Sequence, residues 1–423
     1  MSAARSSRWP RSSFGPPSSV EEILRVLYIN PFSQQVSGPD ESLRGLLKPL
    51  IRRGVEPHLV LPRPGPQVAR YEAMGVCVHY APMSILHRRF SPVELALFGP
   101  TLLWGSTAIA TIARRIGADL IHTNMEVVLD GAIAARWLGL PHVLHYRGNS
   151  LDQPLQVFDL LTWIWTGLSD RVFCISDTTS GIFARRGRSA KVSTLYNPID
   201  LAAFAEAPRS AKIRATFGAD DGDTLIGTVG RIHPRKDLDT FVRAAALVAR
   251  DRPRAKFVVV GAAEGTIEEA YLEQLRTTTA ALGLERRLVF ADARRDMPAT
   301  FKAFDIFVLA SRHEGFGRVV AEAMAAGIPT VVSREGALPE LVTDEANGLC
   351  ATPADVEDFA AKIGGLTDDP ALRATFSGAA QERSRAFDSV ACAERVLATY
   401  RTLCSTRAST RSSRAIASGN VRR

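Results

Sequence analysis

One strand–turn–helix stretch near residue 310 constrains the fold of this chain more than any other. Ile306–Leu309 is a short run of apolar strand formers, which indicates a buried strand of a parallel sheet. Gly315 and Gly317 then allow a sharp backbone turn. Strong helix formers run from Val319 until Gly327 ends the pattern. This order predicts an α/β unit whose helix N-terminus offers unpaired N–H groups to an anion.

Two carboxylates frame this turn. Glu314 follows the strand, and Glu322 lies eight residues later, inside the predicted helix. A carboxylate beside a phosphate site suits the hydroxyl groups of a sugar or ribose. A helix cap and a solvated helix face are the structural alternatives. We favour binding because small apolar residues follow Glu322, where a carboxylate is costly without a partner.

A second turn carries three cations. The strand-like run 224–230 ends at Gly230, and Arg231, Arg235 and Lys236 precede a long amphipathic helix that starts near Leu238. Like charges crowded into one turn repel one another, and an anion between them removes the repulsion. A guanidinium and an ammonium group together suit a diphosphate. The turn therefore predicts a diphosphate site, with a solvated cluster as the alternative.

Strand-like and helical stretches alternate along the chain. In the first half, apolar runs recur at 24–30, 58–61, 76–80, 119–123, 141–146, 171–175 and 192–196, with helical patterns between most of them. Such alternation predicts βαβ units, a parallel sheet and helices on both of its faces. At 423 residues the chain is too long for one ordinary core, so we expect two domains.

Polar residues at strand ends are further candidates, because ligands of parallel sheets bind beyond the carboxyl ends of the strands. His122 and His145 each end a predicted strand. We interpret His122 as a core histidine. Arg147 and Gly148 directly follow the strand of His145 and favour a cleft position for it. Gly38 lies in the loop between the first predicted strand and helix, which is a weaker phosphate-turn signal.

Two motifs resemble those of the retaining GT-B glycosyltransferases of the family 4 type, the glycosyl transferases group 1. They are the run Glu314-Gly-Phe-Gly followed by Glu322, and Gly230-Arg231 followed by Lys236 five residues after the arginine. The likeness spans roughly residues 23–404, with its specific motifs in the second half. It implies an α/β fold of two Rossmann-like, doubly wound parallel-sheet domains that face a central cleft.

The resemblance also implies roles for individual residues. Arg231 and Lys236 would clamp the donor diphosphate, Glu314 would hold the transferred sugar, and Glu322 would hold the ribose hydroxyls. His145 would contact the transferred sugar and is counted with Glu314, Arg231 and Lys236 among the catalytic candidates. The other donor-binding positions that the resemblance implies are Gly38, Gly230, Phe290, Gly315, Phe316 and Gly317.

Composition and resemblance together predict the domain organisation. Residues 1–22 and 405–423 are rich in Ser and Arg and are expected to be disordered tails. Residues 23–204 would form the acceptor-binding domain and 205–384 the donor domain, with a helix at 385–404 packing back on the first domain. We interpret Asn197–Asp200 as the hinge, with Phe204 packed beneath it.

The predicted function is transfer of a hexose from a UDP- or GDP-sugar to an acceptor hydroxyl, with retention, in the synthesis of cell-surface polysaccharide, glycolipid or another glycoconjugate. The acceptor is a sugar, a lipid-linked molecule or a small molecule. No cofactor and no metal are expected, because the two cations and the helix N-terminus would stabilise the leaving diphosphate. The one Asp-x-Asp of this region, Asp237 and Asp239, follows the basic turn, and Asp237 suits a helix cap.

Other functions remain as alternatives. A non-catalytic nucleotide-sugar or carbohydrate-binding module is the main one. A sugar-nucleotide epimerase or a phosphorylase is disfavoured by the basic clamp and by the lack of an obvious cofactor lysine. The net charge is +8, but much of it lies in the tails with little aromatic interleaving, so no nucleic-acid partner is expected.

The sequence also bears on location. Five scattered cysteines without a paired spacing indicate a reducing compartment, and we expect a cytoplasmic protein. Residues 92–113 come closest to a membrane span, but Glu94 and Pro100 interrupt them, so a core or interface helix is favoured. The alternative is peripheral contact with the inner face of the plasma membrane, since Trp104 lies on this helix and basic residues flank it at 87–89 and 114–115.

Overall fold

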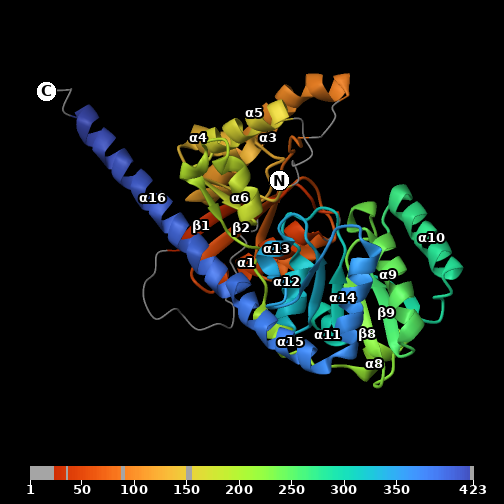
Figure 1. Cartoon of the computed structure of the whole chain (residues 1–423). Coiled ribbons are helices and arrows are strands. Elements are labelled where there is room, and N and C mark those ends of the chain that lie inside the picture. Colours follow the sequence, from red (N-terminus) through yellow and green to blue (C-terminus); the bar gives the residue numbers. More distant parts are fainter. Residues whose placement is uncertain (1–22, 35–36, 87–90, 149–154, 420–423) are drawn as a thin grey trace, which may run out of the picture.

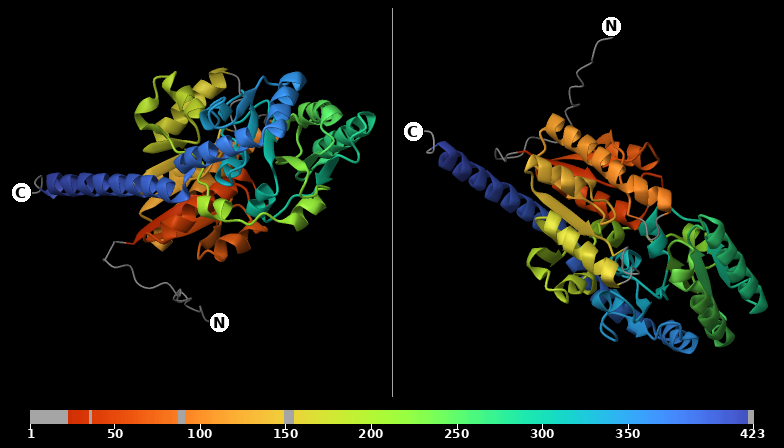
Figure 2. Two further views of the ribbon diagram at one scale, coloured as in Figure 1. Left: turned by 60° about the horizontal axis from the view of Figure 1, so that its bottom comes forward. Right: turned by 90° about the horizontal axis from the view of Figure 1, so that it is seen from above.

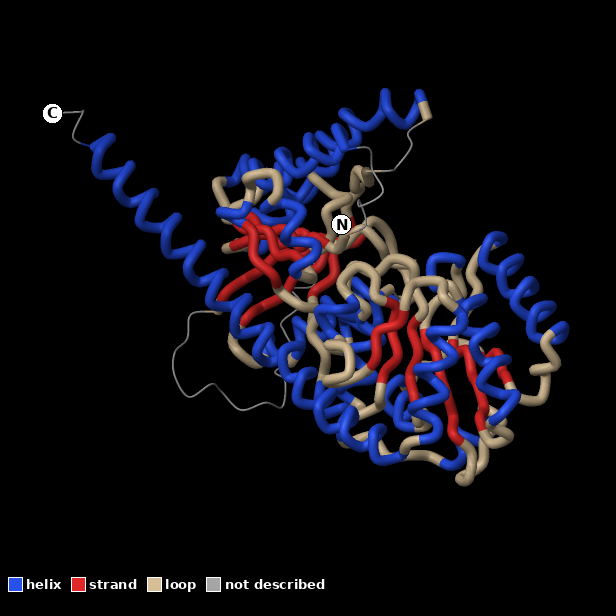
Figure 3. The backbone as a smooth tube through the Cα atoms, in the orientation of Figure 1, coloured by secondary structure: helices blue, strands red, loops and turns tan. Residues whose placement is uncertain are grey.

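The computed structural model describes residues 23–34, 37–86, 91–148 and 155–419 and shows two α/β domains that face each other (Figure 1). Each domain is built on one parallel sheet, and the two sheets are separate (Figure 3). The expected N-terminal tail, residues 1–22, lies outside the described residues. The expectation of two parallel-sheet domains is confirmed.

The sheet of the first domain has the strand order β3-β2-β1-β4-β5-β6-β7. Its strands are β1 (Leu24–Ile29), β2 (Val55–Leu61), β3 (Cys77–Tyr80), β4 (Leu120–Thr123), β5 (His142–Tyr146), β6 (Arg171–Cys174) and β7 (Val192–Thr194). β1 lies near the centre, pairing with both β2 and β4, and the chain winds outward from it in both directions. This is the doubly wound arrangement, which leaves a crevice at the strand ends where the winding reverses.

The sheet of the second domain repeats this pattern with the order β10-β9-β8-β11-β12-β13. Its strands are β8 (Thr224–Val229), β9 (Ala255–Val260), β10 (Leu288–Ala291), β11 (Ile306–Leu309), β12 (Thr330–Ser333) and β13 (Leu349–Ala351). β11 is buried throughout, as its continuous apolar run predicts. The basic turn follows β8 and the glycine turn follows β11, and these neighbouring strands bring the two turns together.

Helices cover both faces of the first sheet. They are α1 (Gly38–Ile51), α2 (Gln67–Glu72), α3 (Pro92–Ile116), α4 (Asp130–Leu138), α5 (Leu155–Leu168), α6 (Asp177–Ala184) and the 3-10 turn η1 (Ser189–Lys191). α1 packs on one face through Leu43, Leu46 and Leu50. α3 and α4 pack on the other face, and α5 shares a second core on that face with α4 and α6.

Helices of the second domain bury their apolar stripes against the second sheet. They are α8 (Ala211–Thr216), α9 (Leu238–Asp251), α10 (Thr266–Ala281), α11 (Met297–Lys302), α12 (Arg318–Ala325), α13 (Leu338–Leu341), α14 (Val356–Asp368), α15 (Pro370–Ser384) and the 3-10 turns η2 (Pro234–Lys236) and η3 (Arg385–Phe387). Phe241 and Val242 of α9 are fully buried against β9 and β11 residues.

The chain passes between the domains twice, at 197–200 and at 385–389. Ile199 N–H donates to the carbonyl of Phe387 at 2.8 Å, and Ser389 N–H donates to the carbonyl of Ile199 at 2.9 Å. The short helix α7 (Leu201–Ala205) packs on α11 and α12, with Phe204 buried there. Residues 201–204 therefore pack with the second domain, and the passage lies at the expected hinge, just before the expected boundary at 204.

The last helix, α16 (Ser389–Gly419), returns to the first domain and covers α1 and the adjacent sheet face. Cys392, Val396 and Tyr400 are buried in that core. The helix continues well past residue 404, so residues 405–419, expected as a disordered tail, are helical instead. Arg407 pairs there with Asp170 at 2.9 Å, which gives the extension one anchor. The far end of α16 projects away from both domains (Figure 2).

Replacing Tyr400 with Phe should lower the free energy of unfolding by about 1–3 kcal/mol, the cost of leaving buried polar groups unpaired. The buried Tyr400 hydroxyl bonds to Tyr28 and to Nδ1 of His122, whose Nε2 has no partner among the described residues. Urea denaturation measures the change. Thr399→Val removes an exposed hydroxyl from the same helix and should change stability by less than about 0.5 kcal/mol. Equal stability of wild type and Tyr400→Phe would contradict the anchoring role of this hydroxyl.

Candidate active site

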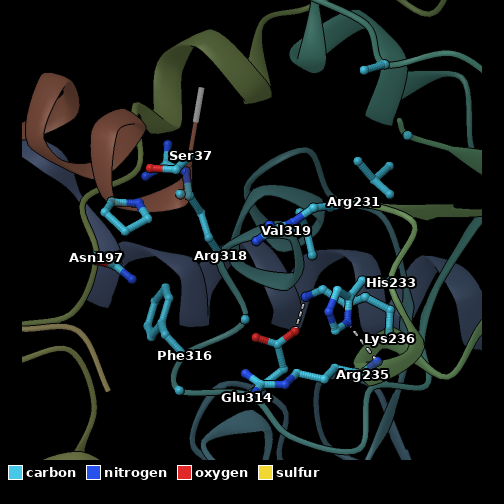
Figure 4. Close-up of a pocket in the computed structure, with 18 of the residues that line it drawn as sticks. Ser37, Asn197, Arg231, His233, Arg235, Lys236, Glu314, Phe316, Arg318 and Val319 are labelled. Carbon is cyan, nitrogen blue, oxygen red and sulfur yellow. Dashed lines mark hydrogen bonds and ion pairs between the residues drawn. The ribbon is translucent and has the colours of Figure 1, made fainter. Parts of the chain in front are cut away.

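A cavity of about 570 Å³ lies between the two domains. The first domain contributes Ser37, Gly38, Arg147, Gly148 and Asn197, and the second contributes the basic turn, the ends of β8 and β9, and residues 313–319. Both glycine-containing turns that the sequence singled out therefore meet at one place (Figure 4). Of the predicted site residues, the structure brings together here Gly38, Gly230, Arg231, Lys236, Glu314, Gly315, Phe316 and Gly317.

The basic turn after β8 enters the cavity as a tight loop. Gly230 has a φ of +150°, and a Cβ on the facing Gly261 would lie 1.9 Å from the Gly230 carbonyl oxygen. Arg231 is exposed to the cavity, and no acidic partner for it occurs among the described residues. Asp237, at the start of α9, makes no side-chain cap; it instead binds Arg312 at 2.9 Å. A cation without a carboxylate thus remains available to an anionic ligand.

Glu314 and Lys236 form an ion pair on the cavity wall (Figure 4). The same Glu314 oxygen accepts a hydrogen bond from Ser311 Oγ at 3.1 Å. The pair joins the turn after β8 to the turn after β11, so the two motifs are in direct contact. An anion bound to Lys236 would share this ammonium group with Glu314 and leave carboxylate oxygen lone pairs for hydroxyl donors.

The glycine turn after β11 places the N-terminus of α12 against the cavity. Gly317 has a φ of +88° and is the N-cap of α12 without a capping side chain. A Cβ at Gly317 would approach Leu338 Cδ2 to 2.6 Å, so the conformation and the close packing both require glycine. Phe316 is buried between Tyr196 and Phe387, with ring centroids 5.8 and 5.4 Å away. The first N–H groups of α12 are therefore held at a fixed place beside the cavity.

Glu322 is buried one turn into α12 and does not line the cavity in this structure. Its carboxylate binds Nε of Arg318 at 2.8 Å. Burial raises the pKa of Glu322 above its ordinary value, and the Arg318 guanidinium opposes the shift. Arg318 itself lines the cavity and donates from Nη1 to the Pro198 carbonyl at 2.9 Å and to Ser42 Oγ at 3.2 Å. It thereby bridges the two domains, a role that the sequence did not indicate.

Two further predicted site residues, His145 and Phe290, also lie away from the cavity. His145 is fully buried, stacks on His122 at a centroid distance of 5.7 Å and packs against Phe173. Burial lowers its pKa well below the ordinary value. The expected cleft position is wrong because His145 still lies within β5, under the helix layer. Phe290 is partly buried and packs against the core beside β9, and the residues beyond it, Ala293 and Arg294, line the cavity instead.

Arg147 takes the place in the cavity wall that was predicted for His145. It is the first residue beyond β5, at the strand end where side chains reach the crevice. Its guanidinium donates to the Asn197 Oδ1 at 2.5 Å and to the Asn124 Oδ1 at 2.6 Å. Burial lowers its pKa to about 9. The adjacent Gly148 was the sequence signal that could have identified it, since a strand-end residue beside a glycine is free to face a ligand.

A further contact joins the two domains near the cavity. Glu340 of α13 accepts hydrogen bonds from the backbone N–H groups of Asp177 and Thr178, at 2.7 and 2.6 Å. A carboxylate from the second domain therefore caps the N-terminus of α6 in the first.

Among the described residues, no three His, Cys, Asp or Glu side chains are grouped so as to hold a metal ion.

Two family models match this chain. The model for glycosyl transferases group 1 matches residues 209–383, and that for glycosyltransferase family 4 matches residues 36–203. Together they cover both domains. The structure of the Anabaena protein HepE in complex with UDP and glucose superposes with a TM-score of 0.74 at 24% identity, covering 89% of this chain and 99% of that one. This likeness shows the fold, and GT-B is confirmed.

Curated relatives agree with the family models. Several are named D-inositol 3-phosphate glycosyltransferase. The one from Kineococcus radiotolerans is 34% identical over 52% of this chain and 54% of its own length. The one from Saccharomonospora viridis is 33% identical over 70% of this chain and 68% of its own length. A GDP-mannose-dependent alpha-mannosyltransferase of Mycobacterium tuberculosis is 28% identical over 77% of this chain and 83% of its own length. The chain therefore belongs to the group 1 (family 4 type) glycosyltransferases with the GT-B fold.

Proposed function

We propose that this protein transfers a hexose from a nucleotide diphosphate sugar to an acceptor hydroxyl, with retention of the donor's anomeric configuration. The observation that carries the proposal is the convergence of Arg231, Lys236 and the N-terminus of α12 on one interdomain cavity. These are three independent sources of positive potential, and together they suit the binding of a negatively charged diphosphate.

The same groups would act on the departing diphosphate. Negative charge grows on the diphosphate as its bond to the sugar breaks, and groups already fixed around it stabilise that charge without reorganising. Arg231 has no acidic partner among the described residues, and Lys236 is held in place by Glu314. We propose that these cations suffice and that the reaction is independent of metals and cofactors.

The two carboxylates would bind the sugar portions of the donor. Glu314 lies at the cavity and has lone pairs left for hydroxyls of the transferred hexose. Glu322 would bind the ribose, for which its carboxylate must share or release Arg318. No side chain takes the place of a covalent nucleophile in this proposal, which fits transfer on the same face of the sugar. His145 is left out of it because of its burial.

The relatives guide the choice of donor. One relative is named for GDP-mannose, and the HepE structure contains UDP and glucose. We therefore propose a UDP- or GDP-hexose donor. We further propose that the acceptor binds on the first-domain side of the cavity, near Arg147 and Asn197, and that the protein has a cytoplasmic role in cell-surface glycoconjugate synthesis. A non-catalytic nucleotide-sugar-binding module is the alternative, and turnover separates the two.

Replacing Lys236 with Ala should weaken nucleotide binding about ten- to a hundredfold, because a charge-assisted hydrogen bond contributes roughly 1.5–3 kcal/mol. Glu314 would lose its partner in this variant, and its negative charge would repel the diphosphate and weaken nucleotide binding further. Isothermal titration with UDP, GDP and ADP in EDTA measures the effect and identifies the base. Lys212→Ala is the matched control, since this exposed lysine of α8 does not line the cavity. Wild-type affinity in Lys236→Ala would remove this residue from the diphosphate site.

The transferase proposal itself predicts turnover in EDTA with the donor whose nucleotide binds. Release of the nucleotide diphosphate, followed with a panel of sugar and lipid-linked acceptors, measures the rate. Proton NMR of the product's anomeric signal should show the configuration of the donor. An inverted product would contradict the retaining mechanism. Tight nucleotide binding without turnover on the whole panel would instead favour the binding module.

A further inference from the structure

Among the described residues, the largest group of exposed apolar side chains lies on the outer faces of α3 and α5 of the first domain. Six of them define what we call the α3–α5 surface: Val93, Leu97, Leu103 and Trp104 on α3, and Leu160 and Trp163 on α5, with exposed fractions of 55–67%. Both helices lie uppermost in Figure 1 and face the viewer in the view from above in Figure 2. Soluble proteins rarely leave so many large apolar groups together without a partner.

Helix α3 is amphipathic in a way that suits a position along a surface. The segment Ala96–Ile116 is long and apolar enough to cross a bilayer, by length and composition only, and 33% of it is buried inside the protein. The inner face of its second half is fixed on the sheet through Ile109 and Ala113. The first half carries exposed Val93, Leu97 and Trp104 outward. A helix held in this way cannot span a membrane while the domain stays folded, but it can lie in the interfacial region.

The exposed charges on α3 and the neighbouring α4 are mostly positive. Arg114 and Arg115 occupy the last turn of α3 and are exposed, and Arg136 is exposed on the neighbouring α4. Each of α3 and α5 carries one acid. Glu94 closes the capping box with Ser91, and Asp159 is paired with Arg186. The second expected basic flank, residues 87–89, lies outside the described residues.

We infer that the α3–α5 surface docks this protein on an anionic lipid bilayer. The two tryptophans suit the level of the headgroups, and the leucines suit the acyl boundary beneath it. The exposed arginines at the end of α3 and on α4 would complement negatively charged headgroups. A protein partner would also cover apolar groups, but a long exposed stripe with Trp residues and a cationic end matches a lipid interface more closely. The inference concerns binding alone and does not depend on the proposed reaction.

Flotation of the full chain with lipid vesicles tests the inference. The protein should float with vesicles of phosphatidylcholine and phosphatidylglycerol, bind less to phosphatidylcholine alone, and lose binding as salt is raised. The double variant Leu103→Glu with Leu160→Glu should reduce the partition coefficient at least about tenfold, because charges replace groups that enter the interface. Leu102 is left unchanged because it packs against the core beneath α3 and α5.

Ile267→Glu supplies the matched control. This isoleucine is 68% exposed on α10 of the second domain, so the change places the same charge on an equally exposed helix outside the surface. Its binding should equal that of the wild type. Equal flotation of the double variant and the wild type, or no flotation of either, would overturn the inference. So would a wild-type dimer in sedimentation that the double variant breaks, because the surface would then serve a second copy of the chain.

Discussion

The two passages of the chain between the domains hold the site in its working geometry. Ile199 exchanges backbone hydrogen bonds with Phe387 and Ser389, so the outgoing and returning segments are joined to each other. Phe387 packs against Phe316, whose glycine turn begins α12. Because of this contact, the N-terminus that faces the cavity is fixed relative to the place where the chain changes domain. Arg318 adds to this link by reaching the Pro198 carbonyl.

The charges at and beside the cavity are arranged in pairs. Lys236 already neutralises Glu314, and Arg318 already neutralises Glu322, so neither carboxylate is left as an uncompensated charge at low exposure. Arg231 differs because no acid among the described residues accompanies it. A diphosphate between Arg231 and Lys236 would thus bind two cations. Its repulsion from Glu314 would be small, because Lys236 already neutralises that carboxylate.

The two faces of the first sheet are covered unequally. α1 is itself covered by α16, which returns from the second domain and buries Val396 and Tyr400 over that face. On the opposite face, α3 and α5 form the outermost layer among the described elements, and Trp104 and Trp163 remain exposed. This asymmetry explains why the α3–α5 surface is available to an external partner.

The sequence by itself determined the alternation of strands and helices and the two glycine turns, because these depend on local backbone preference and on periodicity. It also determined the two motifs that contain Arg231, Lys236 and Glu314, because their spacing is a property of the sequence. It did not determine which strand-end side chain reaches the cavity. His145 and Arg147 are two residues apart, and only the length of β5 decides that the first is buried and the second faces the cleft. The outward face of α5 was likewise decided by packing between segments far apart in the chain, which no local pattern records.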